Sequence, residues 1–111
     1  AVILEEYFDK YFNGVSDEYM LYTSTFKEDS EIYESISHID NTCRVQICKI
    51  GYIKNILQEF NKRTGCPMLL NTSLNLSGKP IAGYPQDAFS LFQSSKLDCV
   101  VIGDKIYENK F

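Results

Sequence analysis

An abrupt change from apolar to polar residues near position 70 constrains the fold more than any other feature. Four apolar residues, Pro67 to Leu70, lead into the stretch Asn71–Ile81, which holds two asparagines, a threonine and two serines before Gly-Lys-Pro. The pattern is typical of a buried strand that opens into a loop, and ligands bind at such strand ends in open α/β sheets. Small hydroxyl and amide side chains can bind phosphate or carbonyl oxygens. They also favour ordinary turns, so a ligand loop and a plain turn are both open.

Helical periodicity predicts three helices. The clearest spans Tyr52 to Lys62, directly before the apolar run, and Thr64-Gly65 and Pro67 end it. The sequence predicts a second helix from Tyr84-Pro85 to Ser94-Ser95-Lys96. A short aromatic helix is predicted over residues 4–12, closed by Asn13-Gly14.

Strand patterns fall between these helices. They cover residues 19–25, 36–50, 68–70 and 97–103, with an edge strand at 106–107. Residues 36–50 are expected to form a strand pair or a bent strand with a break near Asp40-Asn41, and residues 97–103 a buried strand. Residues 26–34 are acidic and are predicted to be an exposed loop. Alternating strands and helices indicate an α/β (α+β) fold.

Length and charge exclude several classes of protein. The 111 residues suit one domain, and 44% apolar with 23% charged residues is typical of a soluble globular protein. A net charge of −4 and the lack of a basic run argue against nucleic acid as a partner. There is no apolar run of the roughly 18–20 residues that a membrane span needs, so no membrane partner is expected. No signal peptide is visible, and the absence of an initial Met is compatible with a fragment.

The four cysteines suggest reduced thiols rather than a metal site. Cys43, Cys48, Cys66 and Cys99 form no C-x-x-C pair, and the chain has one histidine. A zinc site is therefore not expected. Three of the cysteines lie within or beside apolar runs, which favours buried thiols in a cytoplasmic protein, although an even count leaves disulfides open.

A second polar cluster lies between His38 and Gln46. On a strand, Thr42, Arg44 and Gln46 share one face, and a guanidinium there could bind phosphate or carboxylate. The alternative is a polar sheet face that simply meets solvent. His38 could act as a general base or as a structural hydrogen-bonding group.

Three blocks of this sequence resemble the carboxy-terminal region of O-carbamoyltransferases of the nodulation and antibiotic-tailoring type. Residues 38–46 (HIDNTCRVQ) are similar to H-x-D-G-[ST]-x-R-x-Q, and residues 64–75 (TGCPMLLNTSLN) to T-G-x-P-x-L-L-N-T-S-F-N. The third block is Lys79-Pro80-Ile81, followed by PQDA at 85–88 and Leu97-Asp98. Residues 73–78 (SLNLSG) also resemble the S-x-N-x-S-G signature of YrdC-like threonylcarbamoyl-adenylate synthases.

The resemblance implies a fold and a reaction. It implies a partial YrdC-like domain, a twisted mixed sheet flanked by helices, with residues 1–111 as a single domain at the carboxyl end of a larger enzyme. Such a domain joins carbamoyl phosphate to ATP, giving carbamoyl-adenylate. An upstream transferase domain, absent from this sequence, then passes the carbamoyl group to a hydroxyl acceptor. ATP enters as a substrate and can bring Mg²⁺; no cofactor is expected to be needed for folding.

The resemblance also implies roles for individual residues. Arg44 would neutralise phosphate charge, while Ser73 and Asn75 would contact the nucleotide or carbamoyl phosphate; these three are the catalytic candidates. Fixed donors of this kind stabilise the charge that develops during adenylate formation. The substrate- or nucleotide-binding candidates are His38, Asp40, Thr42, Asn71, Thr72, Ser77 and Lys79.

Three departures from the family pattern bear on these roles. Asn41 replaces a glycine, which requires a turn that accepts asparagine, and Leu74 replaces a phenylalanine. A basic stretch of the form K-x-R-E…R-P-F-A-P, which precedes this region in the family, is not in the sequence. We therefore expect the isolated chain to be inactive. A non-catalytic nucleotide- or phosphate-binding module, or a purely structural one, is the alternative.

Overall fold

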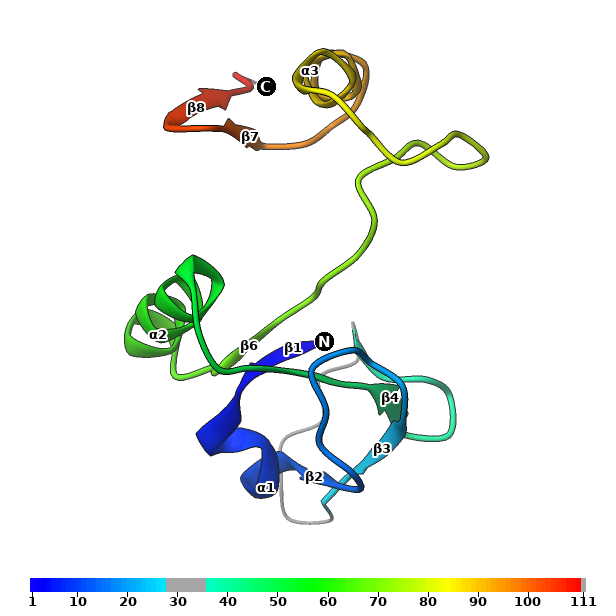
Figure 1. Cartoon of the computed structure of the whole chain (residues 1–111), viewed down its shortest axis with the longest axis vertical. Coiled ribbons are helices and arrows are strands. Elements are labelled where there is room, and N and C mark those ends of the chain that lie inside the picture. The colour runs from blue at the N-terminus through cyan, green and yellow to red at the C-terminus, as the bar shows by residue number, and fades with distance from the viewer. Residues whose placement is uncertain (28–35, 111) are drawn as a thin grey trace. The chain divides into compact units, whose positions relative to one another are not determined.

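The computed structural model describes residues 1–27 and 36–110, which form two compact units, Ala1–Asn71 and Thr72–Phe111 (Figure 1). Most of the predicted acidic loop at 26–34 lies outside the described residues. The predicted α/β (α+β) class is confirmed. The described strands form three small sheets, two in the first unit and one in the second.

The first unit contains a mixed sheet and an antiparallel sheet. The strands are β1 (Val2–Leu4), β2 (Phe12–Asn13), β3 (Thr23–Phe26), β4 (Thr42–Arg44), β5 (Gln46–Cys48) and β6 (Met68–Leu69). In the mixed sheet the order is β5-β1-β6, with β1 parallel to β5 and antiparallel to β6; the second sheet has the order β2-β3-β4. A 3-10 helix, η1 (Glu5–Tyr7), and the short helix α1 (Phe8–Tyr11) connect β1 to β2.

The predicted helix over residues 4–12 is therefore wrong at both ends. Leu4 ends β1, where it pairs with Cys48, and Phe12 begins β2, where it pairs with Phe26. Aromatic and aliphatic residues suit a buried strand as well as a helix face, so the pattern alone did not separate the two. Pairing with strands distant in the sequence decided the outcome.

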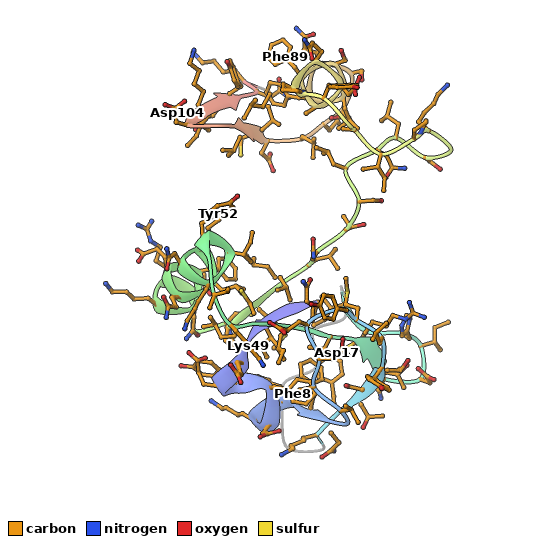
Figure 2. All side chains as sticks on the ribbon, in the orientation of Figure 1. Phe8, Asp17, Lys49, Tyr52, Phe89 and Asp104 are labelled. Carbon is orange, nitrogen blue, oxygen red and sulfur yellow. The ribbon has the colours of Figure 1, made fainter. Side chains whose placement is uncertain are left out.

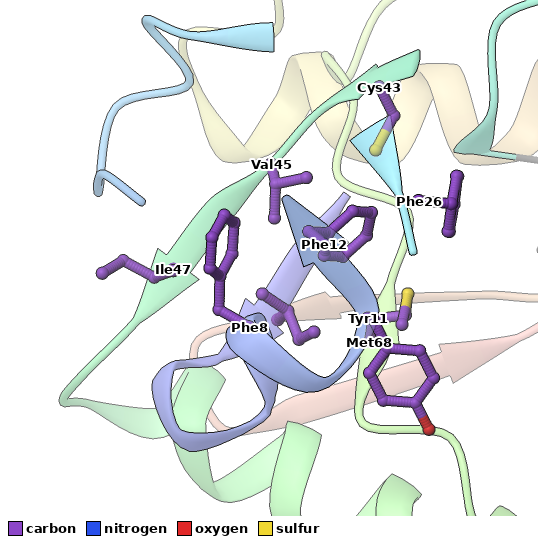
Figure 3. Close-up of a cluster of buried hydrophobic side chains, with 9 residues drawn as sticks. Phe8, Tyr11, Phe12, Phe26, Cys43, Val45, Ile47 and Met68 are labelled. Carbon is purple, nitrogen blue, oxygen red and sulfur yellow. The ribbon is translucent and has the colours of Figure 1, made fainter. Parts of the chain in front are cut away.

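The main core lies under both sheets of the first unit. Cys43 of β4, Ile47 of β5 and Val45 between the two strands belong to this core, together with Phe8 and Phe12 (Figure 3). The centroids of the Phe8 and Phe12 rings are 5.6 Å apart, at a separation common for packed aromatic pairs. This alternation confirms that Thr42, Arg44 and Gln46 share the opposite face.

Helix α2 (Tyr52–Thr64) confirms the clearest helix prediction and covers the other face of the mixed sheet. It packs against β1 and β6 (Figure 1). Leu57 is fully buried there, in a cluster with Val2, Leu4 and Cys48. The helix ends where Gly65 adopts φ +77 and donates its N–H to the Asn61 carbonyl at 2.7 Å, a conformation that favours glycine.

The predicted strand over residues 19–25 is only partly correct, because β3 begins at Thr23. The segment before it is a turn: the Asp17 carboxylate accepts hydrogen bonds from the N–H groups of Tyr19 (2.7 Å) and Leu21 (3.3 Å), and Met20 has φ +57. Positive φ is incompatible with a strand. Hydrogen bonds to the Asp17 side chain therefore take the place of the strand pairing that is predicted for residues 19–22.

The second unit is one helix packed on one hairpin. Helix α3 (Pro85–Ser94) is confirmed, and the Asp87 carboxylate accepts the N–H groups of Gly83 (3.1 Å) and Tyr84 (3.0 Å) at its start. Strands β7 (Cys99–Ile102) and β8 (Lys105–Glu108) pair antiparallel. The core is small: Ala88, Phe92 and Val100. The predicted buried strand over residues 97–103 is confirmed as a strand only for Cys99–Ile102, and within it Cys99 and Val101 are exposed on the uncovered hairpin face.

Among the described residues no helix has the length and apolar content needed to cross a membrane. All four cysteines are free thiols. The buried-thiol prediction is confirmed for Cys43 and Cys48, whereas Cys66 is half-buried and Cys99 is exposed. Burial raises the pKa of the Cys43 thiol, so this cysteine stays protonated.

Candidate functional site

A tight turn before β4 positions the first group of predicted site residues. The His38 N–H donates to the Thr42 carbonyl at 2.7 Å, and the Asn41 N–H donates to the His38 carbonyl at 3.0 Å. Asn41 has φ +61, in the left-handed region. The turn thus accepts asparagine at the position where the family pattern has glycine, because asparagine tolerates this conformation better than most residues.

Asp40 braces this turn. One of its carboxylate oxygens, Oδ1, accepts hydrogen bonds from the Thr42 hydroxyl (2.6 Å) and the Thr42 N–H (3.2 Å). The hydroxyl bond, followed by the backbone bond, lowers the pKa of Asp40 below its ordinary value of 3.8. Asp40 is therefore a carboxylate at neutral pH, and its bonds to Thr42 make it a positioning residue for the turn and for β4.

Arg44 lies at the end of β4 beside an open hollow. Strand register places Thr23 of β3 opposite Arg44 and Thr25 opposite Thr42. The hollow, of about 880 Å³, is lined by Thr23, His38, Ile39, Asp40, Thr42 and Arg44. Among residues 1–27 and 36–110, no acidic side chain forms an ion pair with the Arg44 guanidinium. Its donors are free to bind an anion bidentately.

The exposed face of this strand run continues to Gln46, which contacts a further predicted residue. The Asn71 side-chain amide donates a hydrogen bond to the Gln46 side-chain carbonyl at 2.9 Å. Asn71 lies two residues after β6 and begins the polar stretch. This bond therefore links the beginning of the polar stretch to the face that carries Arg44. Both residues belong to the first unit.

The second group of predicted site residues lies in the loop that opens the second unit. Asn75 organises this loop: its side-chain N–H₂ donates to the carbonyls of Leu76 (3.2 Å) and Lys79 (2.9 Å), and its oxygen accepts the Ser73 hydroxyl at 2.6 Å. The Lys79 N–H closes a turn on the Leu76 carbonyl at 2.9 Å, with Gly78 at φ +75. Asn75 thus has a structural role in the loop.

The other loop candidates are exposed. Thr72 and Ser77 are exposed, as is Ser73, whose oxygen can still accept a hydrogen bond. Lys79 lines a hollow of about 540 Å³ next to α3. The rest of that lining is Leu76, Pro80, Ile81, Ala82, Asp87, Ser90, Leu91 and Ser94.

The predicted site residues therefore fall into two groups, one in each unit. The structure brings together His38, Asp40, Thr42 and Arg44, and it joins Asn71 to their face through Gln46. Ser73, Asn75 and Lys79 form a group of their own in the second unit. Each group is ordered by contacts within its own unit.

The placement of the His, Cys, Asp and Glu side chains bears on metal binding. Nowhere in the described part of the chain do three or more His, Cys, Asp or Glu side chains converge as a metal site would require. Magnesium is held in proteins by one or two carboxylates together with substrate phosphates. That ATP brings Mg²⁺ stays a prediction.

Sequence comparison identifies the family. The profile of the family described as "Carbamoyltransferase C-terminus" matches residues 1–109, which is nearly the whole chain. The chain belongs to this family. The matched region covers the whole of the first unit and all but the last two residues of the second.

Curated relatives include several nodulation proteins. Nodulation protein NolNO of Sinorhizobium fredii is 33% identical over 79 residues, which are 68% of this chain and 12% of that protein. Nodulation protein NolO of Bradyrhizobium diazoefficiens is 36% identical over 72 residues, or 62% of this chain and 13% of that protein. Nodulation protein U of Rhizobium tropici is 32% identical over 91 residues, or 78% and 15%. The chain thus spans about one eighth of the length of these relatives.

Two further residues lie beside the predicted site residues, and the sequence does not single them out. Gln46 bonds to Asn71 because β5 and β6 flank the same strand, β1. Thr23 enters the arginine hollow because of its register with Arg44. Neither signal is visible in a single sequence, since both depend on which strands pair.

Proposed function

We propose that this chain is the carboxy-terminal part of a carbamoyltransferase and contributes to making carbamoyl-adenylate from carbamoyl phosphate and ATP. Overall, one carbamoyl phosphate, one ATP and one water would give carbamoyl-adenylate, pyrophosphate and orthophosphate. Transfer of the carbamoyl group to a hydroxyl acceptor would then release AMP. Family membership supports the carbamoyl chemistry. The use of ATP and the transfer to a hydroxyl acceptor are part of the proposal.

One observation carries the proposal: the Arg44 guanidinium is unpaired among the described residues and borders an open hollow. Both substrates are phosphate compounds, and a fixed guanidinium can bind two phosphate oxygens at once. The Thr42 hydroxyl donates to Asp40, so its oxygen can still accept a hydrogen bond from a bound group. The Asp40–Thr42 bonds hold this wall in place before any substrate binds, which is how fixed donors contribute to catalysis.

The test uses the full-length protein that contains this chain. Carbamoyl-phosphate-dependent exchange of labelled pyrophosphate into ATP reports adenylate formation without requiring the acceptor. Arg44→Ala should lower the exchange rate about 100-fold, the typical effect of removing a donor to developing charge. The matched control is Arg63→Ala, whose guanidinium is exposed on α2 and pairs with Glu59 at 2.8 Å; it should leave the rate unchanged.

Absence of carbamoyl-phosphate-dependent exchange in the wild-type protein would contradict the proposal. ATP binding without exchange would instead favour a non-catalytic nucleotide-binding module. An unchanged rate in Arg44→Ala would remove Arg44 from the reaction. The contribution of the loop is tested in the same assay with Ser73→Ala.

A further inference from the structure

One side-chain hydrogen bond holds the start of the polar stretch. Residues 70–73 belong to no helix, strand or turn, and Leu70 is 59% exposed, so packing restrains this stretch only weakly. Within the described part of the chain, the Gln46–Asn71 bond is the one hydrogen bond that ties residues 70–73 to the mixed sheet. A stretch without such support samples many backbone conformations. This bond therefore limits the path that the chain takes after β6.

The acceptor end of this bond is fixed by the mixed sheet. Gln46 belongs to β5, and its N–H donates to the Ala1 carbonyl at 2.8 Å, while the Ala1 nitrogen donates to the Arg44 carbonyl at 2.9 Å. Ordered elements flank β5 on both sides, because β4 precedes it and α2 follows it. Figure 2 labels Lys49 and Tyr52, between which the chain passes from β5 to α2. The Gln46 side chain therefore extends from a backbone that is held at a set distance from Arg44.

The donor end of the bond, Asn71, brings a further polar group to the face that carries Arg44. Gln46 and Arg44 are two residues apart on this face, which separates their Cα atoms by about 7 Å. After donating one N–H to Gln46, the Asn71 amide keeps its other N–H and its carbonyl for a substrate. Without Gln46, neither group would have a defined direction.

The bond joins two neutral amides near the surface, so it contributes little to the stability of the whole fold. Its effect is on direction. We propose that Gln46 is a positioning residue that acts through Asn71. It holds the Asn71 amide on the face that carries Arg44 and fixes the direction in which the polar stretch leaves the first unit. That this arrangement serves adenylate formation rests on the proposed function.

Limited proteolysis of the full-length protein with chymotrypsin, read as cleavage after Leu70, tests the bond without reference to any reaction. Gln46, Leu70 and Asn71 border an apolar pocket of about 330 Å³. Gln46→Met keeps the length and the apolar contacts of the side chain but removes the acceptor, so cleavage should become about fivefold faster. Gln46→Glu has the same length and keeps an acceptor oxygen, so cleavage should proceed at the wild-type rate.

Pyrophosphate exchange shows whether Gln46 acts through Asn71. Gln46→Met should slow the exchange about fivefold and Asn71→Ala about tenfold. The double variant should be no slower than Asn71→Ala alone, because Gln46 then has no amide to position, whereas independent losses would multiply to about fiftyfold. Gln46→Glu is unsuited to this assay, because its charge lies two residues from Arg44. The matched control is Gln58→Met, an exposed amide on α2 that should match wild type in both experiments.

The outcomes separate this inference from the proposed function. Unchanged cleavage after Leu70 in Gln46→Met, at an unchanged melting temperature, would show that the bond does not hold the stretch. Losses that multiply in the double variant would show that Gln46 does not act through Asn71, even if exchange is present and depends on Arg44. If the cleavage results are as expected but the wild-type protein shows no exchange, the positioning of Asn71 stands and the proposed reaction is wrong.

Discussion

Strand β1 in the first unit is covered on both faces, whereas the β7–β8 hairpin of the second unit is covered on one. Ile3 lies in the main core, while its neighbours Val2 and Leu4 pack in the cluster under α2. In the hairpin, Val100 faces α3, but Val101 and its cross-strand partner Ile106 are exposed. Burial of apolar area is the dominant stabilising term, so the two units should respond very differently to the same substitution.

The largest difference is expected for isoleucine-to-alanine substitutions in the two strands. Ile3→Ala should lower the free energy of unfolding by about 2–5 kcal/mol, because it leaves a cavity in a closed core. Ile106→Ala, at a side chain that is 64% exposed, should change it by less than about 0.5 kcal/mol. Urea unfolding of the full-length protein, followed by probes in each unit, measures both. Equal losses would mean that the hairpin face is covered by another part of the protein.

The loop of the second unit depends on one side chain, so its removal should give the next largest effect. Asn75→Ala deletes the bonds to Ser73, Leu76 and Lys79 and should destabilise the loop by about 1–2 kcal/mol. Amide exchange at Lys79 and Ala82 should then become about tenfold faster. Asn55→Ala on the surface of α2 serves as the control. Unchanged exchange in Asn75→Ala would show that the backbone alone orders the loop.

In the first unit the turn at 38–41 is held by backbone bonds, and a smaller effect is expected there. Asn41→Ala should cost about 1 kcal/mol, because alanine disfavours the left-handed conformation. Asn41→Gly should lie within about 0.5 kcal/mol of wild type, since glycine adopts this φ freely but is more flexible when unfolded. Thermal unfolding of the two variants measures the difference. A loss in Asn41→Gly as large as in Asn41→Ala would show that the asparagine side chain, not its φ, matters.

The smallest effect is electrostatic and local to the same turn. Thr42→Val removes the hydroxyl that donates to Asp40 and should raise the pKa of that carboxyl toward 3.8. The folded-state pKa of Asp40 is depressed, so the ionised carboxylate contributes to the stability of the fold. This contribution is complete above about pH 3.8 and is lost as the pH falls through the folded-state pKa. The acid limb of the stability profile should therefore be shallower in Thr42→Val. Carboxyl NMR titration measures the pKa directly, and an unchanged value would contradict the role given to Thr42.

Predictability from sequence differs between elements for a physical reason. The helices α2 and α3 were predicted correctly because their periodicity, their ends and their flanking Gly and Pro residues are local signals. The alternation through Cys43, Val45 and Ile47 was also correct, and it put Arg44 on the exposed face. Residues 19–22 were predicted as strand from their composition, but the Asp17 carboxylate turned the backbone there into a loop.

The candidate site also divides into features set by neighbouring residues and features set by strand pairing. The sequence by itself determined the polar stretch after residue 70, the turn at Asp40-Asn41 and the exposed face of Arg44, because each depends on neighbours within a few residues. Only the tertiary structure decided that Asp40 braces β4, that Asn75 holds its own loop, and that Asn71 meets Gln46 at the mouth of an apolar pocket. Contacts such as the last one depend on which strands pair, and a pairing between distant segments leaves no periodic signal in either of them.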